Sequence, residues 1–310
     1  MKHVSVLLEE TIEQLRVKPD GIYVDATLGR GGHAEALLQK LENGHLYAFD
    51  RDARAIAESK ERLQPYLDKV TFLHRDFASL KEALREEGVE GIDGIMMDLG
   101  VSSPQFDDPS RGFSYRFDTR LDMRMDQESP KDAYMVVNTY SLNDLIAILR
   151  NYGEERYAPQ IAKAIVKARE SAPVETTGQL VEIIKSALPE RVLRQKGHPA
   201  KQTFQALRIE VNDELEDLKH GLTDALELLN ANGRCAVITF HSLEDRIVKQ
   251  IFKAYSTAPF VDPKLPLKES QMEQASFRLI TKKPILPKEE ETNENHRAHS
   301  AKLRVIEKKG

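Results

Sequence analysis

A short glycine-rich segment carries the first residues whose types and spacing could bind a ligand. It reads DATLGRGGH at residues 25–33 and lies between a predicted strand and a predicted helix. Glycine permits positive φ and close approach of the backbone to a ligand, and the first N–H groups of a helix attract a carboxylate or a phosphate. A tight strand-to-helix turn without a ligand would have the same pattern, so the loop alone decides little.

Acidic residues follow the next two predicted strands. Asp50 ends the second strand, where a carboxylate can accept both hydroxyl groups of a ribose. Asp76 and Phe77 end the third, where an acceptor and a ring would lie beside an adenine. Because Ala34 breaks the G-x-G-x-x-G spacing and Asp25 would repel a pyrophosphate, an adenosine that carries a small zwitterion fits better than a dinucleotide. S-adenosylmethionine has that combination.

The segment DLGVSSPQF at residues 98–106 follows the fourth predicted strand. It resembles the small-polar-Pro-aromatic loop of methyltransferases that modify exocyclic amino groups of bases. The lone pair of such a nitrogen is delocalised into the ring, so it is a weak nucleophile until acceptors hold both N–H protons. Proline would keep that loop rigid, and an aromatic ring could stack on a flipped base. A Ser-Pro turn after a strand is the alternative interpretation.

Alternating strands and helices would position these segments. Strands are expected at residues 22–26, 46–49, 70–73 and 92–99. Helices are expected at residues 4–16, 33–41 and 52–63, and after Ser79 with Glu82 as a capping box. Short apolar strands separated by helices indicate βαβ units and a buried parallel sheet.

The alternation stops after the fourth strand and returns only at residues 234–240. Helical patterns between them lie at residues 141–150, 157–170, 177–187 and 200–230. We therefore predict an α/β domain of residues 1–106 and 207–310 and an inserted helical domain of residues 107–206. Further capping patterns are Ser141 with Asp144, Thr176 with Gln179 and Ser242 with Asp245. Two final strands are expected at residues 277–280 and 301–306, with a loop between them.

The composition limits the class of protein. The 310 residues carry a net charge of −5, and no apolar run approaches the ~20 residues that cross a bilayer. We expect no signal peptide, and the single Cys235 excludes an internal disulfide and a thiolate zinc cluster. These features predict a cytoplasmic protein without a membrane segment or a metal site. Any nucleic-acid site would need a local basic patch.

An arginine-rich stretch beside the fourth-strand motif is one candidate for such a patch. It contains Arg111, Arg116, Arg120 and Arg124, interleaved with Phe113, Tyr115 and Phe117. Charge runs are usually solvated faces, but this composition also suits the stacking of bases and the neutralisation of phosphates. A second basic cluster lies at the other end of the insertion and comprises Arg194, Lys196 and Lys201. The two clusters could lie together.

Several segments together resemble one family. Besides residues 25–33 and 98–106, they are HVSVLL at 3–8, RLDMRMD at 120–126, YGEER at 152–156, TFQALRIEVN at 203–212 and FHSLEDR at 240–246. From residue 3 to about 306 the chain resembles the bacterial 16S rRNA (cytosine-N4)-methyltransferase family, also called RsmH or MraW. The tail departs from the family pattern, with His296 and His299 where the family often has Pro and Arg.

The resemblance implies a Rossmann-like, class I S-adenosylmethionine-dependent methyltransferase sheet with an inserted helical substrate-recognition domain. The implied substrate is the exocyclic N4 amino group of a cytidine in the decoding (P-site) region of 16S rRNA, and the implied partner is that rRNA or the small ribosomal subunit. The implied cofactor-binding residues are Gly31, Gly32, His33, Asp50, Phe77, Asp98 and Gln105. The predicted catalytic residues are Ser103, Pro104 and His241.

Two other functions stay open from the sequence. One is an S-adenosylmethionine enzyme that acts on a small molecule or a protein, and the other is a ribosome-assembly factor that only binds RNA. The sequence is also compatible with a homodimer. Cys235 lies centrally in the fifth-strand pattern and is expected to be core, so we predict direct methyl transfer without a covalent intermediate.

Overall fold

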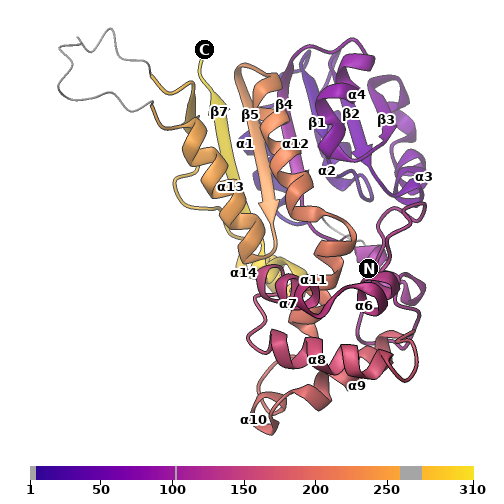
Figure 1. Ribbon diagram of the computed structural model, residues 1–310. Helices are drawn as coiled ribbons and strands as arrows, with labels where there is room; N and C mark the ends of the chain where they lie inside the picture. The colour runs from indigo at the N-terminus through magenta and orange to yellow at the C-terminus, as the bar shows by residue number, and fades with distance from the viewer. Residues whose placement is uncertain (1–4, 102, 259–273) are drawn as a thin grey trace, which may run out of the picture. The chain divides into compact units, whose positions relative to one another are not determined.

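The computed structural model describes residues 5–101, 103–258 and 274–310, and it divides the chain into two compact units (Figure 1). The sheet unit combines Met1–Gly100 with Leu215–Gly310, and the helical unit is Val101–Glu214. The helical unit therefore starts before the predicted boundary at residue 107 and ends after the one at 206. The physical reason is packing, because Phe106 contacts the apolar core of the helical unit and Val211 is buried in it.

Within the described residues, the sheet unit contains one seven-stranded sheet with the order β3-β2-β1-β4-β5-β7-β6. Its strands are β1 Ile22–Asp25, β2 His45–Asp50, β3 Val70–His74, β4 Ile92–Asp98, β5 Leu229–Thr239, β6 Phe277–Leu279 and β7 Lys302–Lys308. Strands β1 to β5 are parallel, and β7 runs antiparallel to β5 and β6. The predicted strands are confirmed. β5 begins at Leu229, earlier than residue 234, and the sequence did not indicate this start because residues 230–233 show no apolar strand pattern.

Helices cover both faces of this sheet (Figure 1). On one face, Leu15, Leu37 and Ile56 are buried from α1 Leu8–Leu15, α2 Gly32–Leu38 and α3 Ala53–Arg62. On the other, Leu84, Leu222 and Phe252 are buried from α4 Leu80–Glu86, α12 Glu214–Leu228 and α13 Ser242–Tyr255. Shorter helices are η1 Gln64–Lys69, η2 Phe77–Ser79, α14 Glu289–Glu294 and η5 His296–Ser300. The last two lie where a loop was predicted between the final strands.

The predicted capping box at Ser79 is wrong. The Ser79 hydroxyl donates to the Asp76 carbonyl at 2.8 Å and makes no cap contact with α4. The 3₁₀ turn η2 precedes α4 directly, so the first free N–H groups belong to that turn. Asp76 accepts one of them, from Ala78 N–H at 2.7 Å.

The helical unit contains mostly short helices around its own apolar core. They are α5 Ser103–Asp107, η3 Pro109–Arg111, α6 Ala133–Thr139, α7 Leu142–Asn151, α8 Ala158–Arg169, α9 Thr177–Ala187, α10 Glu190–Leu193 and α11 Lys201–Val211. The helices predicted from residue 141 to 187 are confirmed, and so are the cap at Ser141 and the capping box of Thr176 with Gln179. The 200–230 stretch is two helices, which break at Asp213 with a positive φ of 51°.

Along the described part of the chain, none of the helices combines the length and the apolar character that a bilayer crossing requires.

Candidate active site

The strand order defines where the sheet unit can bind a ligand. β1 lies between β2 and β4, with β3 beyond β2 and β5 beyond β4. In open α/β sheets, ligands bind outside the carboxyl ends of the strands at the point where the strand order reverses. That point lies between β1 and β4, which end in Asp25 and Asp98. These two carboxyl groups therefore lie beside the expected ligand position.

The glycine loop connects β1 to α2 and has conformations that require glycine. Gly29 has φ +51°, and Gly31, which precedes the first turn of α2, has φ +70°. A Cβ at Gly32 would overlap Ser5, so the backbone here packs closely against the N-terminal segment. The Gly29 N–H donates to Asp50 Oδ2 at 2.8 Å, which ties the loop to the end of β2.

Asp50 is oriented by backbone groups on both of its oxygens. Oδ2 accepts from Gly29, and Oδ1 accepts the Asp52 N–H at 2.8 Å. Each carboxylate oxygen keeps a second lone pair, so Asp50 can still accept the two hydroxyl groups of a ribose. Burial raises the pKa of Asp50 to about 6.

Thr27 contacts both acidic residues at the switch point, the carboxyl group of Asp25 and the backbone of Asp98. Its N–H donates to Asp25 Oδ1 at 3.1 Å, and its hydroxyl oxygen accepts the Asp98 N–H at 2.6 Å. Burial raises the pKa of Asp25 to about 7. Burial, and then the charges of Asp25 and Glu244, raise the pKa of Asp98 to about 8. One oxygen of each group, Asp25 Oδ2 and Asp98 Oδ1, is buried without a partner among the described residues.

His33 lies in the same cluster, on the first turn of α2. Its Nε2 donates to the Val6 carbonyl at 3.1 Å, so Nδ1 is the ring's free acceptor. That Nδ1 lies 3.8 Å from Asp98 Oδ2, too far for a hydrogen bond. Burial lowers the pKa of His33 to about 4, and the ring is therefore neutral near pH 7.

Phe77 lies after β3 and is mostly buried against α12. A Cβ at Gly221 would meet its ring, which shows how closely the helix approaches. The Arg51 guanidinium lies 6.0 Å from the ring centroid and pairs with Asp76 and with Asp217, the latter at 3.0 Å. Asp76, which the sequence placed beside an adenine, is thus held by Arg51 and by the backbone of η2.

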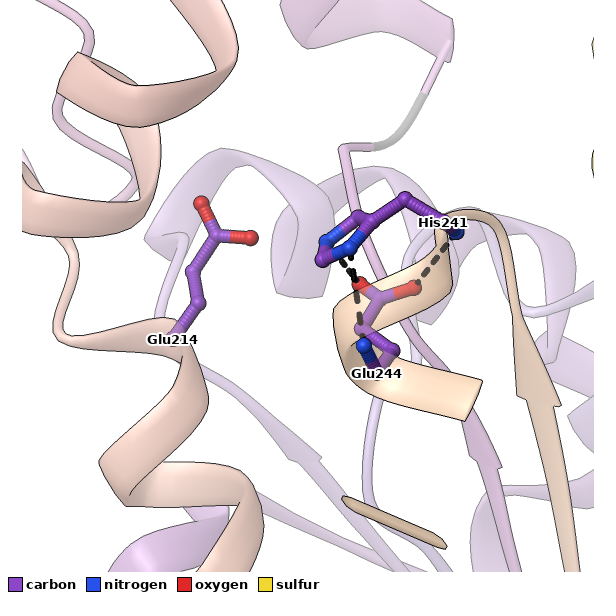
Figure 2. Close-up of side chains that lie close together, drawn as sticks. All are labelled: Glu214, His241 and Glu244. Atoms are coloured by element: carbon purple, nitrogen blue, oxygen red, sulfur yellow. Dashed lines mark hydrogen bonds and ion pairs between the residues drawn. The ribbon is translucent and has the colours of Figure 1, made fainter. Parts of the chain in front are cut away.

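His241 precedes α13 and is its N-cap (Figure 2). The prediction that Ser242 caps this helix is wrong by one residue. His241 Nδ1 accepts the Glu244 N–H at 3.5 Å, and Glu244 Oε2 accepts the backbone N–H groups of Phe240 and His241 at 2.7 and 3.2 Å. His241 Nε2 lies 3.1 Å from Glu244 Oε1. Sequence reasoning missed Glu244, although an acid three residues after a cap is the signal of a capping box.

The remaining predicted site residues belong to the helical unit. Ser103 and Pro104 start helix α5 rather than a loop, and their side chains lie outside what the structure describes. Gln105 is buried, with 7% of its surface exposed. The sheet unit by itself thus brings together Gly31, Gly32, His33, Asp50 and Asp98, while the roles of Ser103, Pro104 and Gln105 stay predictions.

Two of the four arginines predicted to face RNA are structural. Arg111 is 4% exposed and donates to the carbonyls of Arg124 and Met125 at 3.0 Å each. Arg124 pairs with Asp122 at 2.7 Å. Sequence reasoning could not separate these arginines from exposed ones, because Arg111 is held by backbone carbonyls and Arg124 by a carboxylate within an irregular segment.

The other basic residues predicted to face RNA are exposed. They are Arg116, Arg120, Arg194, Lys196 and Lys201. Tyr115 stacks on His198, with ring centroids 4.1 Å apart and an interplanar angle of 10°. That contact joins the segment that carries Arg116 to the segment that carries Lys196. Phe117, next to Arg116, is 43% exposed.

Residues 1–309 match the MraW methylase family. The chain belongs to that family. The ribosomal RNA small subunit methyltransferase H of Oenococcus oeni is 54% identical over 308 residues, which cover 99% of this chain and 98% of the relative. An rRNA methylase of Streptococcus thermophilus is 12% identical, with a TM-score of 0.42 over 98% of this chain and 94% of the other. A Streptococcus mutans protein solved in complex with SAH is 13% identical, with a TM-score of 0.44 over 99% of both chains.

Family membership and the parallel sheet confirm the predicted fold, and S-adenosylmethionine is the cofactor. The residues present fit it. S-adenosylmethionine carries a positive sulfonium and a positive ammonium group, which the unpartnered oxygens of Asp25 and Asp98 would attract. Its ribose hydroxyls suit Asp50. The individual contacts predicted for Gly31, Gly32, His33, Asp50, Phe77, Asp98 and Gln105 stay predictions.

Proposed function

We propose that this methyltransferase of the MraW family methylates the exocyclic N4 amino group of a cytidine in the decoding (P-site) region of 16S rRNA. The observation that carries the proposal is the segment DLGVSSPQF, which starts at the carboxyl end of β4 beside the switch point. The naming of the Oenococcus oeni relative as a ribosomal RNA small subunit methyltransferase supports rRNA as the substrate. We place the protein in the cytoplasm with the small ribosomal subunit as its partner.

The protein's task is to make a weak nucleophile reactive and to orient it. S-adenosylmethionine supplies an electrophilic methyl group on a good leaving group. In the proposed arrangement, Ser103 and the Pro104 carbonyl accept the two N–H protons of the cytosine amino group, so that its lone pair is localised on nitrogen. Orientation and preorganised acceptors would supply most of the acceleration. Gln105 would close the site near the methionine end of the cofactor.

The sheet unit offers no reactive thiol for a covalent route. Cys235 is completely buried in the middle of β5, and burial raises the pKa of its thiol. A thiol is nucleophilic only as the thiolate, so burial keeps Cys235 inert. This supports direct transfer, after which the methylated nitrogen loses its proton.

The proposed RNA-binding face is the exposed basic surface of the helical unit. Arg116 and Arg120 would neutralise phosphates, and Phe117 would stack on a base. Arg194, Lys196 and Lys201 would extend the face, since the Tyr115–His198 stack joins the two segments. A homodimer stays a prediction, which analytical ultracentrifugation would test.

Transfer of a labelled methyl group tests the proposed reaction. The full chain would be incubated with S-adenosylmethionine and, separately, with naked 16S rRNA, assembled small subunits and tRNA. Nucleoside mass spectrometry should find N4-methylcytidine at one position of the decoding region and none in tRNA. Label on carbon 5 of cytosine, on another base or on protein would contradict the proposal, and no transfer to any RNA would favour an RNA-binding assembly factor.

A further inference from the structure

The carboxyl groups of Asp25 and Asp98 form an acidic pair at the point where the cofactor binds. Thr27 links the two residues, since its N–H donates to Asp25 Oδ1 and its hydroxyl oxygen accepts the backbone N–H of Asp98. Asp25 is only 2% exposed. Asp25 Oδ2 and Asp98 Oδ1 are buried and accept no hydrogen bond from the described residues. A pair of buried oxygens without donors costs free energy unless a proton or a cation supplies the missing partner.

The groups that face this pair do not supply a positive charge. Asp98 faces Asp25, Glu244 at the start of α13 and the neutral ring of His33 on α2. Asp25 faces Asp50 at the end of β2. In the part of the chain that the structure describes, the ion pairs of Lys and Arg do not include Asp25 or Asp98. The compensating charge must therefore come from solution or from a ligand.

We propose that Asp25 and Asp98 form a charge-selective pair, which holds a proton in the free protein, gives it up when the cationic end of S-adenosylmethionine binds, and thereby favours this donor over its product S-adenosylhomocysteine. The donor carries one positive charge more than the product, because methyl transfer converts the sulfonium into a neutral thioether. The pair attracts the positive sulfonium of the donor. The product no longer has this charge, so its attraction to the pair is weaker and its release is favoured.

The pH range follows from the two groups. Burial raises the pKa of Asp25 to about 7 and that of Asp98 to about 8, so near neutral pH the pair holds a proton. A bound cation favours the ionised form and expels this proton. As pH rises through this range the free pair ionises by itself, so donor affinity should increase by up to about tenfold per pH unit for one released proton, and then level off. Affinity for the product should change less.

Isothermal titration of the full chain with each cofactor form tests the proposal without RNA. Titrations at pH 6, 7, 8 and 9, in buffers of different ionisation enthalpy, give both the dissociation constant and the number of protons released. We expect close to one proton released per S-adenosylmethionine near pH 7.5 and a smaller number for S-adenosylhomocysteine. The affinity ratio of donor to product should rise with pH.

Two isosteric variants and one control decide which groups are responsible. Asp25→Asn keeps an oxygen for the Thr27 N–H but removes the charge. It should therefore lower donor affinity at pH 8 by about tenfold or more and reduce proton release. Its effect on the affinity for the product should be smaller. Asp98→Asn should do the same and serves as the second test if the first variant is poorly folded in a thermal melt. Asp93→Asn, at the opposite end of β4 and paired with Lys18 at 2.8 Å, should leave both quantities unchanged.

Equal losses of donor and product affinity in both variants, or unchanged proton release, would overturn the proposal and leave the pair as a structural turn. The inference depends on the cofactor and not on the RNA target. A different methylated nucleotide would therefore contradict the proposed function while leaving these titrations interpretable.

Discussion

The carboxyl groups of the sheet unit have two opposite kinds of environment. Around the glycine loop, burial raises the pKa of Asp25, Asp50 and Asp98. Burial also acts on Asp93 and Asp245, but Lys18 and Arg304 hold the pKa values of these two below the usual range. Asp93 and Asp245, which support the fold, are thus paired with cations. Asp25 and Asp98 at the switch point have no cationic partner among the described residues and are available to a ligand.

The raised pKa of Asp25 predicts how the stability of the free protein changes with pH. A carboxyl group whose pKa is raised by folding stabilises the protein below its unfolded pKa of about 3.9, and this contribution is lost as pH rises through the folded value. The loss runs from the unfolded to the folded value, so between about pH 4 and pH 7 the cofactor-free protein should lose thermal stability, at roughly 2–4 °C for each kcal/mol. Asp25→Asn should flatten this decline. Melting curves that stay parallel for the two proteins would show that Asp25 does not titrate in this range.

Asp50 should contribute to cofactor affinity through its two oxygens. If they accept the ribose hydroxyls, Asp50→Ala removes charge-assisted hydrogen bonds worth roughly 1.5–3 kcal/mol, which corresponds to about ten- to hundredfold weaker binding. Isothermal titration with S-adenosylmethionine measures this, and the exposed Asp20→Ala variant is the control. Because Asp50 also holds the Gly29 N–H, a melting curve must accompany the titration. An unchanged dissociation constant would mean that the ribose does not bind to Asp50.

At the scale of helices and strands, the sequence predicted what depends on local pattern. Each of the parallel strands β1 to β5 contains a short apolar run, and the capping box of Thr176 with Gln179 is a four-residue signal. The missed helix α6, Ala133–Thr139, is short and contains adjacent valines, which have low helix propensity. Its cap, Asp132, accepts the Met135 N–H at 2.7 Å.

Features that depend on contacts distant in the sequence could not be predicted in the same way. The pairing of Asp25 with Asp98 requires the strand order, which places β1 beside β4. The internal role of Arg111 depends on carbonyls more than ten residues away. Sequence alone therefore proposed most residues of the candidate site but not their charge states or their partners.

His241 is the N-cap of α13, so two substitutions can separate its structural role from its predicted catalytic role. His241→Ala removes the acceptor for the Glu244 N–H and should destabilise the protein by about 1 kcal/mol, measured by chemical denaturation. His241→Asn supplies a good N-cap and should restore most of that stability. If the ring also contacts the target base, as the predicted catalytic role of His241 requires, His241→Asn should still lose methyl transfer. Full activity in this variant would show that His241 acts only as a helix cap.

The two units of the whole molecule differ in the groups they present. The sheet unit carries the acidic groups and the glycine loop for a cationic cofactor, and the helical unit carries the exposed basic residues of the proposed RNA-binding face. With a net charge of −5, the protein must bind RNA through a local face rather than through its overall field. Cofactor affinity and RNA affinity should therefore respond to different substitutions.

Replacing Arg116 and Arg120 together by Ala tests that separation. Each lost phosphate contact should reduce the slope of log affinity against log salt by roughly 0.7 for single-stranded RNA, so the pair should reduce it by up to about 1.4. Arg120 also pairs with Asp132 at 2.9 Å, and the loss at this position should be the smaller of the two. Filter binding of a decoding-region fragment across a salt series measures the slope, and titration with S-adenosylmethionine should show unchanged cofactor affinity. Lys163→Ala with Lys167→Ala, two exposed residues of α8, makes the same change in net charge elsewhere on the helical unit. Equal effects of the two double variants would mean that RNA responds only to net charge, and the proposed face would then be wrong.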